Sequence, residues 1–336
     1  MLVDAHAHLW TRENLPDGNR WSYARMWSWY RGFEFTGTRR RFLPASDQRG
    51  PWRDADEVFP RVGISAWDPE GEDLIAYMDA LGIDKIVNMT VDWGIAWGEE
   101  PEADVFEVNE HAASLREKLP GRYYQAVGVD PRRRNAAEIA EKFIKEHGAV
   151  AIKLLAANGF SPDDHICYPV YEVAKALEVP IVVHTGTGDL ASFVEPAHPW
   201  KLEAPAKDFP DVQFVAAHAG GGLDGLWREI ILMTQFVPNI AVDLAEWQYP
   251  VQPTDLDPGR EQEFVHVLNI LRRNMGAHNI IWATDYMKGH HRENDQFIID
   301  LMNDFSGRAK KFGYTFTEEE AELIRAANAI RIYGLS

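Results

Sequence analysis

The stretch AVAIKLLAANGFSPDDHICYPVYEVAKALEVPIVVHTG spans residues 149–186 and contains two short apolar runs on either side of a helical segment. The runs at 149–156 and 179–186 have the length and the β-branched content of buried strands. The segment 168–178 between them has the periodicity of an amphipathic helix. Two strands joined by a helix form a parallel βαβ unit, so this stretch predicts an α/β fold.

The same alternation continues on both sides of this unit. Eight repeats in about this length predict a (β/α)8 TIM barrel, which we expect as a single domain over residues 1–336. The alternative is an open doubly wound sheet, but the glycine-rich phosphate turn that often follows its first strand is absent. The remaining strands are expected at 3–10, 84–91, 123–130, 212–221, 239–247 and 279–286, and further helices at 72–82, 105–121, 136–148 and 263–276.

A segment of about residues 11–65 interrupts the alternation directly after the first strand. It is rich in Trp, Arg, Pro and Gly and shows no sustained periodicity, so we expect an insertion loop with short helices. Arg39, Arg40 and Arg41 lie in it, and arginine suits bidentate recognition of a carboxylate. We expect this loop to cap the barrel mouth and to contact the substrate; the alternative is an interface between two copies in a homodimer.

Composition excludes several classes of function. The chain has 336 residues, of which 46% are hydrophobic, so it can bury a substantial core. Its formal net charge of −18 argues against nucleic acid and anionic membranes as partners. No apolar run approaches the roughly 20 residues that span a bilayer. The only cysteine, Cys167, excludes an internal disulfide and no apolar leader precedes the first strand, so we expect a cytoplasmic protein.

Two histidines stand two positions apart in the first strand, in the sequence VDAHAHLW at residues 3–10. Positions i and i+2 of a strand share a face, so His6 and His8 point into the same space. Two imidazoles so placed can hold one divalent metal ion. Taken alone the pair is weak evidence, because either histidine could be a hydrogen-bonded core residue.

Other polar residues end the later strands. In a (β/α)8 barrel the carboxyl ends of the strands form the active-site face. His184 ends the fifth expected strand, His218 the sixth and Asp285 the eighth, while Lys153 lies in the fourth. Three histidines and one carboxylate suffice for a divalent ion with a position left for water, and His218 remains for proton transfer or substrate polarisation.

With these residues the chain resembles the amidohydrolase superfamily, in the amidohydrolase-related branch that contains aminocarboxymuconate semialdehyde decarboxylase. The resemblance covers nearly the whole chain except the insertion. It is carried by DAHAH (4–8), GVDP (128–131), IKL (152–154), VVHTG (182–186), AHAGG (217–221), TDY (284–286) and RAANAIRIYGL (325–335).

The resemblance implies specific roles for these residues. His6, His8, His184 and Asp285 would bind one divalent metal ion, Zn or Mn, and His218 would be the catalytic histidine beside it. Asp285 would also accept a proton in catalysis. In two-metal relatives a lysine of the fourth strand is carboxylated and bridges the ions. A structural or supporting Lys153 is favoured here, because one metal ion is usual in this branch. Contact with the substrate is a secondary expectation for Lys153.

The same resemblance leaves three interpretations of function. The first is a metal-dependent hydrolase that uses a metal-activated water on a small anionic carboxylate, at an amide, ester, lactone or carbon–carbon bond. The second is a nonoxidative decarboxylase of an aromatic or unsaturated acid at the same site. The third, a noncatalytic ligand-binding relative, is disfavoured because all five expected site residues occur together.

Overall fold

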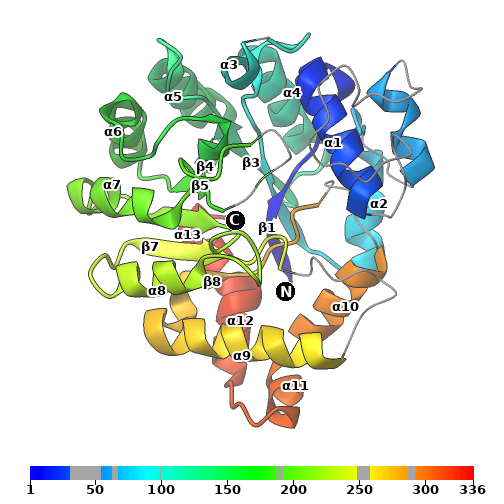
Figure 1. Ribbon diagram of the computed structural model, residues 1–336, viewed down its shortest axis with the longest axis vertical. Coiled ribbons are helices and arrows are strands. Elements are labelled where there is room, and N and C mark those ends of the chain that lie inside the picture. The colour runs from blue at the N-terminus through cyan, green and yellow to red at the C-terminus, as the bar shows by residue number, and fades with distance from the viewer. Residues whose placement is uncertain are drawn as a thin grey trace.

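Eight parallel strands pair in sequence order in the computed structural model of the chain (Figure 1). All eight lie where the alternation of apolar runs predicts them, so the expected (β/α)8 barrel is confirmed. The structure describes residues 1–30, 54–62, 67–98, 100–186, 188, 192–247, 258–286 and 292–336. The strands are β1 Val3–Ala7, β2 Lys85–Met89, β3 Tyr123–Gly128, β4 Ala151–Leu154, β5 Ile181–His184, β6 Phe214–Ala217, β7 Ile240–Asp243 and β8 Ile280–Ile281.

The last strand returns to the first and closes the barrel. Beyond the two residues of β8, the chain stays alongside β1 and forms an isolated parallel bridge between Ala7 and Tyr286. The Asp285 amide donates to the His6 carbonyl over 2.8 Å, and the His8 amide donates to the Tyr286 carbonyl over 2.7 Å. The backbone on both sides of the seam is thereby fixed at the residues that carry the predicted metal ligands.

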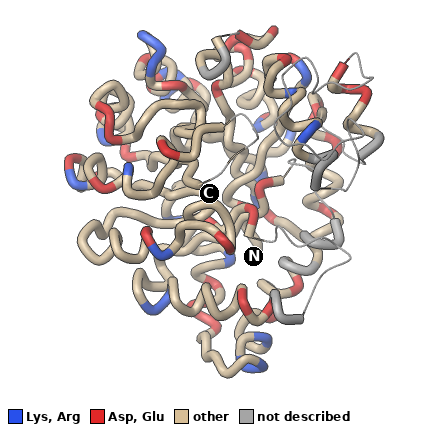
Figure 2. The backbone as a smooth tube through the Cα atoms, viewed as in Figure 1, with Lys and Arg blue, Asp and Glu red and all other residues tan. Residues whose placement is uncertain are grey.

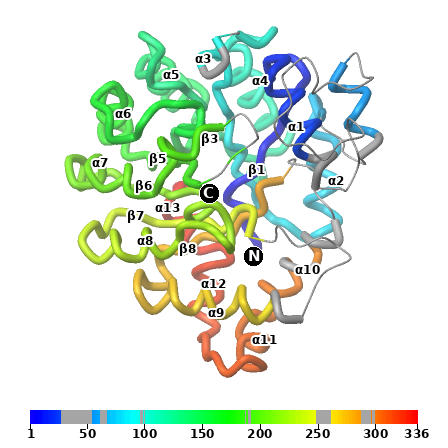
Figure 3. Tube along the Cα trace, in the orientation of Figure 1, coloured from blue at the N-terminus to red at the C-terminus, as the bar shows by residue number. Residues whose placement is uncertain are grey.

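Helices surround the strands, as the trace in Figure 3 shows. Those expected from periodicity are all present, and several end at a glycine in the left-handed conformation, for example Gly148 (φ 69°) after α5. The helices are α1 Asp17–Tyr30, α2 Glu72–Leu81, α3 Gly94–Trp97, α4 Val105–Lys118, α5 Ala136–His147, α6 Tyr168–Leu177, α7 Glu203–Asp208, α8 Trp227–Thr234, α9 Pro258–Met275, α10 Arg292–Asn303, α11 Phe305–Lys311, α12 Glu318–Glu322 and α13 Asn328–Tyr333.

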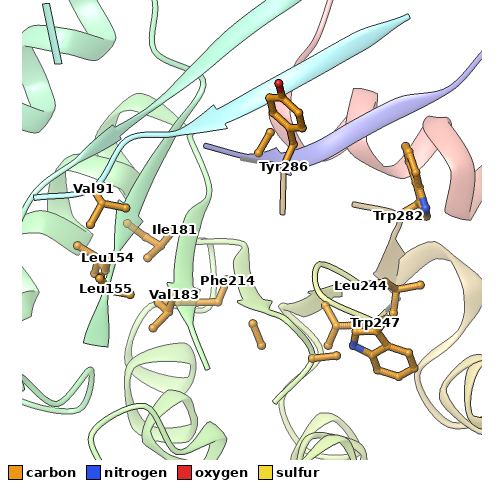
Figure 4. Close-up of a cluster of buried hydrophobic side chains, with 14 of the residues drawn as sticks. Val91, Leu154, Leu155, Ile181, Val183, Phe214, Leu244, Trp247, Trp282 and Tyr286 are labelled. Atoms are coloured by element: carbon orange, nitrogen blue, oxygen red, sulfur yellow. The ribbon is translucent and has the colours of Figure 1, made fainter. Parts of the chain in front are cut away.

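Apolar side chains on the two faces of the sheet form two buried clusters. Along β5, Ile181 and Val183 belong to the larger cluster and Val182 to the smaller. The larger cluster contains residues of the surrounding helices α2, α5 and α6, whereas the helix residues of the smaller cluster come from the C-terminal α13 and the helical turn before it. The larger cluster therefore fills the space between the strands and the helices around them; Figure 4 shows Ile181 and Val183 beside Leu154 of β4. Successive strand side chains point to opposite faces. His184 therefore shares the barrel side of β5 with Val182.

The described parts of the insertion contain more helix than the sequence suggests. α1 has 14 residues, longer than the short helices expected, and two 3-10 turns, η3 (Ala55–Glu57) and η4 (Phe59–Val62), follow later. Arg12 joins the two parts, because its guanidinium donates to Asp56 over 2.6 Å and to Asp54 over 3.2 Å. Residues 39–41, the three arginines expected to contact substrate, lie outside the described residues.

Charged residues of both signs are interspersed over the outer helices and loops (Figure 2). Within the described part of the chain, no helix combines the length and the apolar character that a membrane span requires.

Asn328 at the start of α13 provides a test of how the C-terminal helix holds the barrel. Its buried side-chain amide donates to the carbonyls of Ala277 (2.7 Å) and Ile280 (2.8 Å), at the start of β8. We expect Asn328→Ala to lower the free energy of unfolding by about 2 to 4 kcal/mol, because both buried carbonyls lose their donor. Urea denaturation measures the change.

Asn274→Ala is the matched control for this substitution. Among the described residues, the exposed Asn274 amide bonds only to the Ile270 carbonyl of its own helix. Its loss should therefore change stability by less than about 0.5 kcal/mol. Equal effects of the two substitutions would show that the Asn328 bonds do not stabilise the start of β8.

Candidate metal centre

The carboxyl ends of the strands place six buried polar side chains around one space. His6 comes from β1, Lys153 from β4, His184 from β5, His218 from the residue after β6, Asp243 from β7 and Asp285 from the chain that continues β8. Each of them is at most 4% exposed. A cavity at this face is lined by His8, Trp10, Tyr23, Val91, Trp93, Lys153, Leu155, His184, Gly188, Ser192, His218 and Asp285.

Three atoms at the seam between β8 and β1 form a compact triangle. His6 Nε2 lies 3.3 Å from His8 Nε2 and 3.4 Å from Asp285 Oδ1, and His8 Nε2 lies 3.2 Å from the same Asp285 oxygen. Atoms that share one tetrahedral ion at bonds of about 2.0 to 2.1 Å are about 3.3 to 3.4 Å apart. The spacing of the triangle therefore fits three ligands of a single divalent ion.

The hydrogen bonds on the outer side of each imidazole fix which nitrogen faces the triangle. His8 Nδ1 lies 2.7 Å from the Met89 carbonyl, which can only accept, so this nitrogen carries the proton. His6 Nδ1 donates to Asp243 Oδ2 over 2.9 Å in the same way. Both Nε2 atoms are then left as lone-pair acceptors.

Acceptor atoms in this arrangement require a positive charge among them. Two nitrogen lone pairs and a carboxylate oxygen within 3.4 Å of one another repel unless a cation or a proton lies between them. Lys153 is the nearest described cation, with its Nζ 3.2 Å from His6 Nε2. Imidazole nitrogen and carboxylate oxygen together suit Zn or Mn.

His218 lies against His6, and His184 lies against His218. The ring centroids of His184 and His218 are 4.5 Å apart, and the His218 centroid is 4.8 Å from that of His6. His6, His218 and Asp285 also offer ligand atoms that lie within 4.8 Å of one another. Burial holds the pKa of His218 well below its usual value, so its imidazole is neutral at neutral pH. The structure thus brings all five predicted histidine and aspartate residues to one site.

Backbone strain concentrates at this face. Among the described residues, five other than glycine have a positive φ, and His218 (63°), Glu246 (66°) and Asp285 (65°) follow β6, β7 and β8. The left-handed conformation is costly for these residue types. It persists here because the surrounding hydrogen bonds hold the backbone, including those from Asp285 to β1 and from the His218 amide to Asp243 Oδ1 (2.8 Å).

Asp243 is a site residue that the sequence interpretation missed. Its buried carboxylate accepts from His6 Nδ1 through one oxygen and from the His218 amide through the other. A carboxylate behind a ligand histidine fixes the ring and raises its basicity. The signal was present in the sequence, since Asp243 ends the seventh apolar run just as His184 ends the fifth.

Aromatic side chains from three segments form one wall of the cavity. Trp10 follows β1, Tyr23 belongs to α1 and Trp93 follows β2. Ring centroids are 5.0 Å apart for Trp10 and Tyr23 and 6.0 Å apart for Tyr23 and Trp93. The contribution of Tyr23 means that the first part of the insertion does reach the barrel mouth.

A buried ion pair holds the segment that carries Trp93. The adjacent Asp92 carboxylate accepts from Arg133 Nε over 2.5 Å and from Nη2 over 2.7 Å, and Arg133 also pairs with Glu100. A Cβ on Gly94 would lie 1.9 Å from Glu100 Oε2, so a larger residue there would displace the Glu100 side chain. The ion pair at Asp92 therefore holds the residue directly before Trp93.

Comparison with known proteins gives a family and a set of similar folds. The family model described as amidohydrolase matches residues 3–335. No curated protein matches the chain in sequence.

Three solved structures illustrate the likeness in fold. The 5-carboxyvanillate decarboxylase of Sphingomonas paucimobilis shares 13% identity over 100% of this chain and 99% of its own, with a TM-score of 0.65. A dihydroxybenzoic acid decarboxylase of Polaromonas with bound manganese shares 17% identity over 99% of this chain and 97% of its own, with a TM-score of 0.58. The 4-oxalomesaconate hydratase of Rhodopseudomonas palustris shares 19% identity over 99% of this chain and 96% of its own, with a TM-score of 0.54.

Asp243→Asn tests the support behind His6. The neutral amide keeps the size of the side chain but loses the charge that accepts from His6 Nδ1, so we expect affinity for Zn or Mn to fall about 10- to 100-fold. Competition with a chromophoric chelator measures this affinity. Asp211→Asn, at an exposed position on the loop before β6, should bind the ion like the wild type; equal affinity of both variants would contradict the role of Asp243.

Proposed function

Since the chain belongs to the amidohydrolase family, we propose that it is a metal-dependent hydrolase of a small carboxylate-bearing molecule. The observation that carries this proposal is the triangle of His6, His8 and Asp285, with a neutral His218 against His6. Ligand atoms and an acid–base pair at one buried site are what the hydrolysis of an amide, ester or lactone needs.

The residues present fit one divalent ion. His6, His8 and Asp285 would hold it, with His184 as the fourth ligand. His218 is also within reach, since one of its ring nitrogens lies within 4.8 Å of ligand atoms of His6 and Asp285. When bound, such an ion polarises a substrate oxygen or a water molecule as a Lewis acid. Both Zn and Mn suit the ligand set, and the manganese in the Polaromonas decarboxylase supports Mn.

The remaining chemistry belongs to the side chains. Asp285 places one carboxylate oxygen in the triangle, and its carboxylate would accept a proton from the attacking water. The neutral imidazole of His218, which lies against His6, would accept or donate a proton. Trp10, Tyr23 and Trp93 exclude bulk water, and the ammonium of Lys153 offers a positive charge to an anionic substrate.

Nonoxidative decarboxylation is a second candidate for the same site. Two of the similar folds are decarboxylases of substituted benzoic acids, and the aromatic wall suits a flat, unsaturated ring. In that reaction Asp285 or His218 would give a proton to the carbon that loses the carboxylate.

We expect a cytoplasmic location and one domain over residues 1–336. We also expect Arg39, Arg40 and Arg41 to contact the substrate, and a homodimer interface is the alternative role for their loop.

A weakly buffered assay distinguishes the two reactions. Hydrolysis of an ester or lactone near neutral pH releases a proton, whereas decarboxylation of a carboxylate takes one up and yields carbon dioxide. The ion-loaded protein is mixed with each member of a panel of lactones, esters, amides and aromatic acids, and a pH indicator reports the change in pH. We expect at least one member to acidify the solution. Alkalinisation with carbon dioxide would favour the decarboxylase, and no reaction in the ion-loaded protein across the panel would contradict both.

His218→Asn tests the acid–base role. We expect kcat to fall about 100- to 10,000-fold while the bound ion is retained, because general acid–base catalysis contributes about that much. Steady-state kinetics and metal analysis measure the two quantities together. His266→Asn, at an exposed position of α9, is the control and should retain both. Loss of the ion in His218→Asn would instead assign His218 as a ligand.

A further inference from the structure

Trp10 has a feature that the proposed chemistry leaves unexplained. Its side chain lines the cavity and is 7% exposed, and its indole Nε1 is buried with no hydrogen-bond partner in the described structure. A buried indole N–H usually has an acceptor, because an unsatisfied donor loses its bond to water without replacement. The missing hydrogen bond makes the free energy of folding less favourable, unless another molecule binds there and supplies an acceptor.

Other tryptophans of this chain follow the usual rule. Trp67 donates to Asp56, Trp227 to the Leu223 carbonyl over 3.1 Å, and Trp247 to the His218 carbonyl over 3.0 Å. Trp282 is also buried without an acceptor among the described residues, but it is not among those that line the cavity. Trp10 therefore combines an unsatisfied donor with a place in the wall of the site.

Neighbouring rings keep the Trp10 indole from turning toward another acceptor. Tyr23 lies 5.0 Å from it and Trp93 6.4 Å, centroid to centroid, from two other segments of the chain. Trp93 is in turn held by the ion pair of Asp92 and Arg133. A third neighbouring ring is that of His8, whose centroid is 5.4 Å away.

This last contact places the Trp10 ring beside the candidate metal ligands. His8 Nε2 is one corner of the triangle with His6 and Asp285. A small molecule bound at the triangle would thus lie against the Trp10 ring. Among the described residues that line the cavity, Asp285 is the only acidic one. No other carboxylate among them therefore competes with a ligand carboxylate to accept the hydrogen bond from the Trp10 indole.

We propose that the Trp10 indole N–H is a substrate-binding donor, reserved for a carboxylate oxygen of the substrate. This inference rests on the proposed function for the location of the substrate. The hydrogen bond selects anionic ligands, because a charged acceptor makes a stronger bond than a neutral one. The protein tolerates the unsatisfied donor in the free state, and ligand binding satisfies it.

Trp10→Phe tests the proposal, with Trp227→Phe as the matched control. Both changes remove the same ring atoms, but only Trp227 gives up a hydrogen bond seen in the structure. Two quantities are measured on purified, ion-loaded protein: the urea midpoint of unfolding, and the affinity for benzoate and for neutral benzamide by calorimetry.

We expect Trp10→Phe to lower the unfolding midpoint less than Trp227→Phe does. We also expect it to weaken benzoate binding about tenfold, while Trp227→Phe leaves it unchanged. Wild-type protein should bind benzoate more tightly than benzamide, and Trp10→Phe should narrow that difference.

Three results would overturn the proposal. An equal or larger loss of midpoint in Trp10→Phe would mean that the N–H has an acceptor within the protein. Unchanged benzoate affinity in Trp10→Phe, or no benzoate binding by the wild type, would remove the carboxylate as its partner. None of these readings depends on turnover, so they remain separate from the panel assay that tests the proposed hydrolase.

Discussion

The hydrogen bonds between the end of β8 and β1 are the constraint on which the site depends. They hold the Asp285 amide on the His6 carbonyl and the His8 amide on the Tyr286 carbonyl. Two of the most distant parts of the sequence are thereby fixed in one register. Asp285 then reaches both imidazoles, and three acceptor atoms meet within 3.4 Å. Closing the barrel and assembling the candidate metal centre are the same structural event.

Asp243 extends this arrangement across the barrel. One carboxylate oxygen orients the His6 ring and the other binds the His218 amide, so a residue of β7 links His6 to His218. The left-handed backbone at His218 and Asp285 has a cost. The hydrogen bonds that the His218 amide donates to Asp243 and the Asp285 amide donates to β1 offset it. This is consistent with a site whose geometry is set before a ligand binds.

Much of this was predictable from the sequence, because the signals are local. Apolar runs and helical periodicity located all eight strands, and the strand-end rule found His184, His218 and Asp285. Asp243 satisfied the same rule and was overlooked, since its partner His6 lies 237 positions away. The contacts of Trp10 with Tyr23 and Trp93 depend on how α1 packs over the barrel mouth, which no periodicity records.

X-ray absorption by Zn- or Mn-loaded protein identifies the ligands of the ion, because the spectrum reports the atoms around it. We expect one ion per chain, with nitrogen and oxygen neighbours at about 2.0 to 2.2 Å and the outer-shell scattering of at least two imidazoles. That scattering should diminish in a His6→Gln variant. A shell of oxygen atoms alone, or a spectrum that His6→Gln leaves unchanged, would contradict the assignment of the ion to this seam.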